Sequence, residues 1–499
     1  MLIYKIHPAI GVARVGDHPD KFFVGPEAPG QPGMEIPDGD GPETSIANGS
    51  YKESGRIKRQ AARFRIFEYD QVGGSQTLIR EITAADATIT WTVVLVNRKA
   101  ALDHKPPLNG IDHRVAARQR NTSVVGAARA GLVIRDPRNQ SITGRNQFGV
   151  KFDQGEFLGK KVYLGELRTD QDGRLLVLGG RGISASADGN QTLDFANNDN
   201  WHDDVSDGPV TATIKFTGDN ERADEASAWV TVAPPDFAPG VGGIVTLYDV
   251  AFQAAIAQGF RAAAVKPSFR RHILPVILRA TNLRFVGDQN DPATGSNFWG
   301  SLPRDPVALS STATTAAAVA LRSAVVEALT SPTIESVLKD AIIPDFLRTY
   351  FAQYKAGEFV SDLNTPVPAL SASEALDRAA LEACVGLNFF PGIEASQTMR
   401  KKIYAEAFRF DPTLPDVTAG FLTEVMACPW QADFEECRDE WWPSQRPDMV
   451  MTNPDQIPGS RAKWAQGVNS RDDMVSKWST LPFVVPTTSA AGETVFVKQ

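Results

Sequence analysis

The chain has 499 residues, of which 42% are hydrophobic and 22% charged. This composition is typical of globular proteins and excludes a disordered or collagen-like chain. The formal net charge of −8 argues against nucleic acid or an anionic membrane as a partner. The densest cationic run, residues 56–65, leads into the apolar sequence IFEY and is more typical of the approach to a strand than of a binding patch.

Residues 1–250 are expected to be rich in strands and turns. Short runs of β-branched and aromatic residues are bounded by Gly, Pro, Asn and Asp, and residues 25–50 form a long loop. The spacing of these runs favours an antiparallel, sandwich-like arrangement. The expected strands cover residues 2–6, 10–15, 65–69, 89–97, 161–167, 174–178, 210–216 and 228–233.

Residues 251–499 are expected to be mainly helical, beginning with a helix that straddles the boundary. Helical spacing of apolar residues predicts helices over residues 243–258, 312–330, 334–356, 372–385 and 400–408. No long flexible linker separates the two regions. We therefore predict an α+β fold in which a β-rich, sandwich-like N-terminal half packs against an α-helical C-terminal half that carries the active site, in one integrated unit.

The three cysteines cannot form a disulfide framework, and at least one thiol is left free. All six histidines lie in the first 272 residues, away from the cysteines in sequence, so no zinc or other metal site is expected. The N-terminal sequence is too polar for a secretory signal peptide, and no run is long enough to cross a membrane. We expect a soluble protein, cytoplasmic by default, with non-classical export left open.

Potentially reactive residues are most concentrated in the stretch 426–447, MACPWQADFEECRDEWWPSQRP. On a helix, Asp433 and Cys437 would lie one turn apart on one face, where a carboxylate could deprotonate a thiol or take a proton from a substrate carbon. The neighbouring tryptophans would desolvate that carboxylate and raise its pKa. The alternative is a solvated charged face beside core tryptophans. A second stretch, 474–484, supplies Trp478.

Other residues that could be catalytic or bind ligands lie in less specific sequence contexts. Cys384 precedes a Gly/Pro turn, where a lone cysteine is more often a small buried residue than a nucleophile. The glycine clusters at 179–182 and 240–243 match no nucleotide-binding motif and are interpreted as turns. Residues 195–209 are rich in Asp and Asn, which could form a calcium loop but favour an Asx-rich turn. His202 in this loop is either a surface residue or part of a site above the sheet.

Together, these segments resemble the L-lysine ε-oxidase and glycine oxidase family of quinoproteins. The resemblance runs through most of the chain in the right order, so it is specific beyond any single motif. The matching phrases are KIHPAIGVARVG (5–16), RIKRQAARFRIFEYD (56–70), ITWTVVLVN (89–97), VYLGELRTDQDGRLLVLGGRG (162–182), FANNDNWHDDVSDGPV (195–210), VAPPDFAPGVGGIVTLYDV (232–250), CVGLNFFPGIE (384–394) and MACPWQADFEEC (426–437).

The resemblance implies a cofactor built from the protein's own side chains, cysteine tryptophylquinone, with no dissociable cofactor. It assigns Cys437 and Trp478 as the cross-linked pair and Asp433 as the residue needed for cofactor formation and as the active-site base. It places Cys384 at a position that lines the active site. His202 stands where an aromatic residue, such as tyrosine, is expected, and the chain is shorter than the characterised oxidases.

The implied activity is oxidative deamination of a small primary amine or amino acid by O2, with release of ammonia and hydrogen peroxide. The resemblance also implies an FAD-dependent flavoprotein partner for maturation and allows a homo-oligomer. Two alternatives stay open: an enzyme acting on an amine of a peptide or protein, and a non-catalytic relative with a binding or structural role. Trp430, Trp441 and Trp442 stay alternatives to Trp478 for the cross-link.

Overall fold

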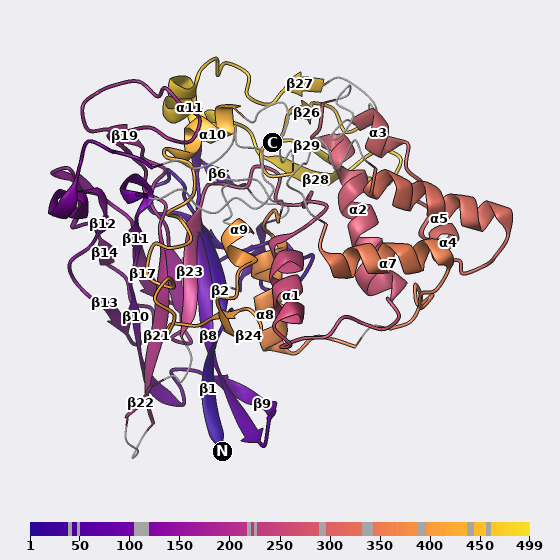
Figure 1. The fold of residues 1–499 in the computed structure, drawn as a ribbon, viewed down its shortest axis with the longest axis horizontal. Helices are drawn as coiled ribbons and strands as arrows, with labels where there is room; N and C mark the ends of the chain where they lie inside the picture. The colour runs from indigo at the N-terminus through magenta and orange to yellow at the C-terminus, as the bar shows by residue number, and fades with distance from the viewer. Residues whose placement is uncertain are drawn as a thin grey trace.

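The computed structural model describes residues 1–37, 42–46, 50–103, 119–216, 221–223, 227–288, 296–331, 343–366, 368–386, 396–436, 444–455 and 461–499. The chain is β-rich in its first half and carries its helices in the second half (Figure 1), which confirms the predicted α+β fold. The predicted cofactor residue Cys437 and the alternatives Trp441 and Trp442 lie outside the described residues.

Most strands of the first half belong to one large sheet, which combines antiparallel and parallel pairings. The parallel pairings are β2–β23 and β3–β8. The strands of this sheet are β1 (Leu2–His7), β2 (Ile10–Arg14), β3 (Phe22–Val24), β4 (Met34–Glu35), β5 (Thr44–Ser45), β8 (Arg59–Val72), β9 (Ser75–Ile82), β10 (Ala87–Val93), β11 (Val96–Asn97), β12 (Ile134–Arg135), β13 (Gln140–Thr143), β14 (Val150–Phe152), β17 (Gly165–Thr169), β18 (Leu175–Leu178), β21 (Asp207–Phe216), β22 (Glu221–Ala223) and β23 (Ala228–Ala233).

The long strand β8 joins two parts of the sheet. Its first half pairs with β18 and β3, and its second half pairs with β1 and β9. Strand β10 shows the alternation expected of a half-buried strand, because Ile89, Trp91 and Val93 are buried while the threonines between them are more exposed. Strands β2 and β23 are buried along their whole length, since the sheet continues on both sides of them, and α8 also packs against β2.

Most helices gather on one side of the sheet in the view of Figure 1, while the last two helices lie above the end of the sheet. Among the described residues, none of the helices is long and apolar enough to cross a membrane. The helices are α1 (Leu247–Ala257), α2 (Leu274–Asn282), α3 (Ser296–Gly300), α4 (Pro306–Leu309), α5 (Ala316–Leu329), α7 (Asp345–Ala356), α8 (Ala372–Glu382), α9 (Ser396–Met399), α10 (Trp430–Glu436) and α11 (Arg471–Lys477), and a 3-10 turn η7 (Trp478–Thr480) follows α11.

Short two-stranded hairpins supplement both halves, and several lie in the mainly helical C-terminal region. The hairpins are β6–β7 (Lys52–Glu53 and Arg56–Ile57), β15–β16 (Gly155–Phe157 and Lys160–Val162), β19–β20 (Ala185–Ser186 and Trp201–His202), β24–β25 (Tyr404–Glu406 and Arg409–Phe410), β26–β27 (Met449–Met451 and Arg461–Lys463) and β28–β29 (Val484–Thr488 and Thr494–Lys498).

The helix predicted over residues 400–408 is wrong. Tyr404 instead pairs with Phe410 in the hairpin β24–β25. Phe408 has a φ of 65°, which a continuing right-handed helix cannot accommodate. Both rings are buried, so burial of the aromatic residues outweighs the local helical pattern.

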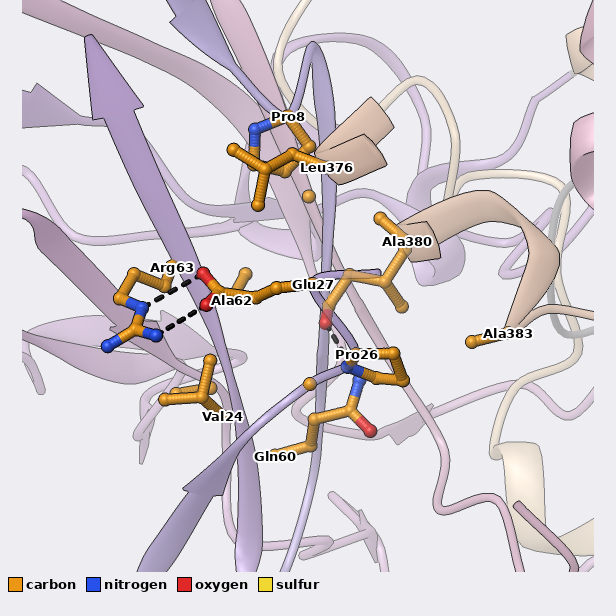
Figure 2. Close-up of a pocket in the computed structure, with 14 residues that line it drawn as sticks. Pro8, Val24, Pro26, Glu27, Gln60, Ala62, Arg63, Leu376, Ala380 and Ala383 are labelled. Atoms are coloured by element: carbon orange, nitrogen blue, oxygen red, sulfur yellow. Dashed lines mark hydrogen bonds and ion pairs between the residues drawn. The ribbon is translucent and has the colours of Figure 1, made fainter. Parts of the chain in front are cut away.

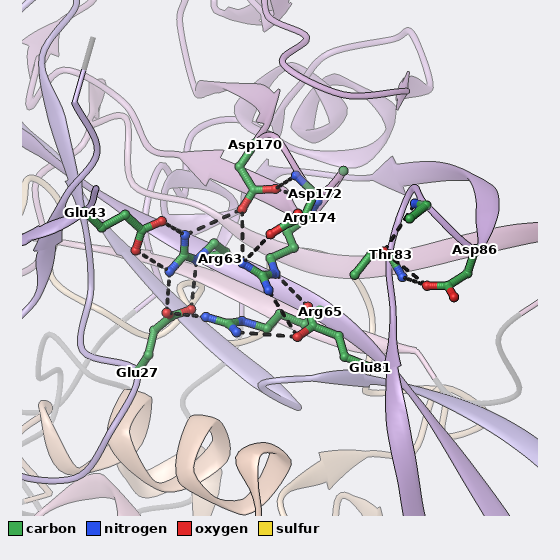
Figure 3. A network of polar contacts seen from close by, with 12 residues as sticks. Glu27, Glu43, Arg63, Arg65, Glu81, Thr83, Asp86, Asp170, Asp172 and Arg174 are labelled. Carbon is green, nitrogen blue, oxygen red and sulfur yellow. Dashed lines mark hydrogen bonds and ion pairs between the residues drawn. The ribbon is translucent and has the colours of Figure 1, made fainter. Parts of the chain in front are cut away.

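The cationic run at residues 56–65 is not a surface patch. From Arg59 onward it forms the first half of β8, and its arginines pair with carboxylates (Figure 3). Arg63 binds Glu27 and Glu43 while its side chain is only 2% exposed. Because a buried guanidinium requires such partners, these residues stabilise the sheet and are unavailable to phosphate.

A buried ion pair connects the sheet to the C-terminal region. Lys99 Nζ lies 2.6 Å from Asp203 Oδ2 and donates a hydrogen bond to the carbonyl of Ala427 over 2.8 Å. Asn97 also donates to Asp203 Oδ1 over 2.9 Å. The side chains of Lys99 and Asp203 are 1% and 0% exposed, so water does not screen the pair.

We expect Lys99→Met to destabilise the protein by about 3–5 kcal/mol, because it leaves the Asp203 carboxylate buried without its cation. Chemical denaturation followed by circular dichroism measures the change. Lys355→Met is the control, since the Lys355–Glu327 pair is exposed and its loss should cost less than about 1 kcal/mol. Equal effects of the two substitutions would contradict this account of the buried pair.

Candidate active site

The segment in which a helix would place Asp433 one turn before Cys437 forms α10, from Trp430 to Glu436, and it is buried over most of its length. The Asp203 carboxylate accepts the N–H of Trp430 over 3.1 Å, which satisfies one of the free donors at the start of the helix. Asp433 is 1% exposed. Trp430 and Asp433 are three residues apart and therefore share a face of the helix.

Trp478 lies beside this helix. Helix α11, capped by Ser470, packs against α10 and leads directly into the turn that contains Trp478. An ion pair between Arg471 and Glu436 joins the two helices at the last described residue before Cys437. The rings of Trp430 and Trp478 meet edge to face, with centroids 5.4 Å apart.

The backbone of Gly182 covers the Trp478 indole. A Cβ at Gly182 would lie 2.1 Å from Cζ2 and 2.6 and 2.8 Å from the two ring atoms bonded to it, Cη2 and Cε2. These similar distances place the added carbon over the face of the ring rather than at its rim. Gly182 also has a φ of +72°, so both its conformation and its contact with Trp478 favour glycine.

Two side chains hold the turn that contains Gly182. Asp204 Oδ2 accepts the N–H groups of Arg181 and Ile183 over 2.6 and 3.0 Å. From the opposite side, Gln431 Nε2 donates to the Gly182 carbonyl over 3.0 Å. Gln431 belongs to α10, so the turn is attached to the helix that carries Asp433.

The electrostatics of this region are dominated by burial. Burial raises the pKa of Asp204 to about 7, although the backbone N–H groups of Ile183 and Arg181 oppose the shift. Asp204 Oδ1 is buried and has no hydrogen-bond partner among the described residues, and the same holds for Nε1 of Trp430. The carboxyl group of Asp204, with a pKa near neutral, therefore binds directly to the turn that contacts Trp478.

His202 lies in the same neighbourhood. It is in β20, where it pairs with Ala185, three residues after Gly182. Its side chain is buried, and its ring centroid lies 5.1 Å from that of Phe157. Burial lowers the pKa of His202, although Asp203 opposes the shift, so the imidazole is neutral at neutral pH. The alternative of a surface histidine is wrong.

Cys384 follows the end of α8. It is 2% exposed, and Arg14 Nη2 and the carbonyl of Ala380 each lie 3.5 Å from its sulfur. These contacts tie Cys384 to the interface between β2 and α8. Asp433, Trp478 and His202 belong to the end of the molecule formed by α10, α11 and β20.

The Asp-rich loop is structural. Asp203 binds Lys99, Asp204 binds backbone amides, and Asp207 accepts from Trp229 and from Thr423. In the described part of the chain, no group of three or more His, Cys, Asp or Glu could hold a metal ion. The structure favours the interpretation as a buried turn over a calcium loop.

Cys428 is also structural. Its sulfur donates to the carbonyl of Trp201 over 3.2 Å, and the side chain is fully buried. Burial is the largest of the effects that raise the pKa of the thiol to about 12, so it stays protonated and is a poor nucleophile.

The cavities differ in what they could hold. Figure 2 shows one between β8, the segment 24–27 and α8, whose volume of about 20 Å³ suits a single water. A cavity of about 440 Å³ lies between α2, α8 and the hairpin β28–β29, and Ala383 is in its wall. That volume suits a small molecule. Trp478, Asp433 and His202 are not among the described residues that line it.

Gly182 and Asp204 were missed as site residues by the sequence reasoning. The glycine cluster at 179–182 was interpreted as a turn, which is correct but incomplete. Two sequences could have indicated them: the glycines at 179–182 and the adjacent aspartates Asp203 and Asp204. Both lie in phrases that carry the family resemblance. Neither phrase reveals that the turn lies on an indole ring more than two hundred residues later.

Comparison with known proteins identifies the family and the fold. Residues 7–232 match the family model described as the L-lysine epsilon oxidase N-terminal domain, and residues 328–465 match that of the L-lysine epsilon oxidase C-terminal domain. The chain belongs to the L-lysine epsilon-oxidase family. The two matches include His202, Asp204, Cys384, Asp433 and Cys437, whereas Trp478 lies beyond the second one.

A curated relative, L-lysine 6-oxidase of Marinomonas mediterranea, is 27% identical over 648 aligned positions, which cover 96% of this chain and 87% of the relative. The alignment is longer than this chain, so the relative carries insertions. The crystal structure of the L-Lys epsilon-oxidase of that organism, and that of its Schiff base intermediate with L-Lys, have a TM-score of 0.76. They are 22% and 23% identical, respectively, and each comparison covers 99% of this chain and 94% of the solved one. They therefore share its fold.

We expect Gly182→Ala to destabilise the protein by about 2–4 kcal/mol, since it combines a strained backbone with overlap on Trp478. Gly189→Ala is the control: Gly189 has a φ of +81° but nothing within 4 Å of its Cβ position, so only the strain of about 1 kcal/mol remains. Thermal unfolding and near-UV circular dichroism measure both. If both substitutions changed the near-UV spectrum equally, the close contact between Gly182 and the Trp478 indole would be contradicted.

We also expect Asp204 to make stability fall as pH rises from about 4 to about 7. The unfolded carboxyl ionises near its usual pKa of 3.8, while the folded one keeps its proton until about 7. The loss is on the order of 4 kcal/mol. Denaturation of the parent and of Asp204→Asn across this range measures it. Because Asp207 and Asp236, with pKa values raised to about 6, act in the same direction, only the difference between the two proteins reports on Asp204.

Proposed function

We propose that this protein is an oxidase of primary amines or amino acids whose redox group is a cysteine tryptophylquinone formed from Cys437 and Trp478. The observation that carries the proposal is the placement of Trp478. Its ring is held between the backbone of Gly182 and the edge-to-face ring of Trp430, beside the helix that ends immediately before Cys437. The relative L-lysine 6-oxidase and the family membership support the same class of reaction.

The residues around Trp478 fit such a group. The Gly182 backbone can lie directly against the ring face because position 182 lacks a Cβ. The Nε1–H of Trp430 is buried beside the ring without a partner among the described residues, and it is the kind of donor that an added quinone oxygen requires. Covalent attachment needs a fixed ring, and Trp478 is only 5% exposed in a packed cluster.

The position of α10 supports Cys437 as the partner. Glu436 is tied to Arg471 at the start of α11, and α11 leads into Trp478. Glu436, the last described residue before Cys437, is therefore tied to the helix that leads into Trp478. Trp430 fits the cross-link less well, because its ring packs against Phe434 as well as Trp478 inside the buried helix.

The bound quinone would supply an electrophilic carbonyl and an acceptor for two electrons. Asp433 would accept the proton from the amine-bearing carbon, and its burial on the Trp430 face of α10 excludes water from that transfer. Neutral His202, behind the turn that contains Gly182, would shape the wall of the site. O2 would take up the two electrons as hydrogen peroxide, and water would release the ammonia.

We propose a free amino acid or small amine as the substrate, in keeping with the relative. Maturation by an FAD-dependent flavoprotein, which the family resemblance implies, is part of this proposal. A panel of free amines and of peptides bearing the same amine, with peroxide as the readout, distinguishes the substrate classes.

The deciding experiment is high-resolution mass analysis of the protein purified from its native host. We expect the peptides around Cys437 and Trp478 to be joined, with a gain of two oxygen atoms and a loss of four hydrogens, two for the thioether and two for the quinone. A native-host protein with both peptides unmodified would refute the oxidase and leave a binding or structural role.

We expect Asp433→Asn to lower kcat for the best amine by about 100-fold or more, or to prevent cross-linking, because the base is lost. Asp473→Asn is a control at a half-buried carboxylate of α11, and it should leave kcat unchanged. A mature Asp433→Asn protein with full activity would contradict the assigned role.

A further inference from the structure

Two adjacent aspartates hold the two walls of the Trp478 ring. Asp203 accepts the N–H of Trp430, whose ring forms one wall. Asp204 accepts the N–H groups on both sides of Gly182, whose backbone forms the other. Adjacent residues of one segment thus bind two elements that contact the same ring.

The two carboxylates have different surroundings. Asp203 is neutralised by Lys99 over 2.6 Å and also bound by Asn97, so its position is fixed from several sides. The hydrogen bonds described for the Asp204 carboxylate come from Arg181 and Ile183, and both end on Oδ2. The carboxylate of Asp204 therefore acts on the turn rather than on a cation.

The contact with the turn is close. A Cβ at Gly180 would lie 2.5 Å from Asp204 Cγ, so the carboxylate packs directly on the backbone at position 180. A Cβ at Gly182 would overlap the indole, as described above. Glycine thus occupies the two positions of the turn that make these close contacts. Gly180 meets Asp204, and Gly182 meets Trp478.

We propose that Asp204 is a positioning residue of the oxidase, which holds the turn 180–183 against the face of Trp478 and so fixes the ring for cross-linking and for reaction with the amine. The inference deepens the proposed function and rests on it. Asp204 acts through the turn and is not assigned a contact with substrate. Loss of its acceptor oxygen would free the turn, widen the space over the ring and allow the indole to tilt.

The test compares Asp204→Ala, Asp204→Asn and Asp136→Ala in the full chain, co-produced with the maturation partner in the native host. Asparagine keeps one oxygen able to accept both N–H groups, and its amide nitrogen would replace Oδ1, which has no partner among the described residues. Asp136 is a matched control, because its carboxylate also accepts two backbone N–H groups, those of Arg138 and Gln154, in a buried side chain away from Trp478.

The first measurement is hydrogen exchange of the peptide spanning residues 179–186. We expect exchange about tenfold faster in Asp204→Ala, near-parental exchange in Asp204→Asn and no change there in Asp136→Ala. The second is the fraction of cross-linked Cys437–Trp478 peptide together with the visible absorption band of the quinone. We expect Asp204→Ala to lower that fraction at least about threefold or to shift the band, and both other variants to match the parent.

Unchanged exchange in Asp204→Ala, or a normal cross-link with an unshifted band, would overturn the proposal. So would an Asp204→Asn protein as defective as Asp204→Ala, since charge rather than the acceptor oxygen would then be responsible. If Asp204→Ala does not fold, Gln431→Met carries the same test, because it removes the second attachment of Gly182. A parent without any cross-link would refute the proposed function, while the exchange result would still decide whether Asp204 holds the turn.

Discussion

The arrangement around Trp478 depends on carboxylates that are buried and bound to backbone amides. Asp203 and Asp204 are both almost fully buried, yet only Asp203 has a lysine beside it. A buried carboxylate costs free energy unless hydrogen bonds replace its water. Here those bonds come from the start of α10 and from the turn at Gly182, so the same contacts that solvate the carboxylates also position both walls of the indole.

This mode of attachment suits segments that have little stability of their own. Helices α10 and α11 are each seven residues long, which is too short for a helix to persist alone in water. The preceding segment is held by side chains from the β-rich half: Arg120 donates to the Met426 carbonyl over 2.7 Å and Asn198 to the Cys428 carbonyl over 3.0 Å. The sheet therefore determines where the C-terminal chemistry lies.

A cofactor made from the chain's own side chains would place particular demands on such a scaffold. The ring has to be held before it is modified, since cross-linking requires a defined distance between two side chains. Packing of Trp478 against Trp430 and Gly182 meets that demand without any bound group. The fold is shared at a TM-score of 0.76 with an enzyme only 23% identical, so the framework tolerates wide change in sequence.

The sequence by itself determined the α+β division, most strand positions and the helical nature of residues 430–436, because alternation and helical spacing are local properties. It also singled out Asp433 and Trp478. It failed at residues 400–408, where burial of Tyr404 and Phe408 overrode a helical pattern. Only the tertiary structure decided that His202 is buried, that Cys384 lies at the β2–α8 interface, and that Asp203 and Asp204 bind two elements that contact the same indole ring. Those facts depend on contacts between residues hundreds of positions apart, which no local pattern encodes.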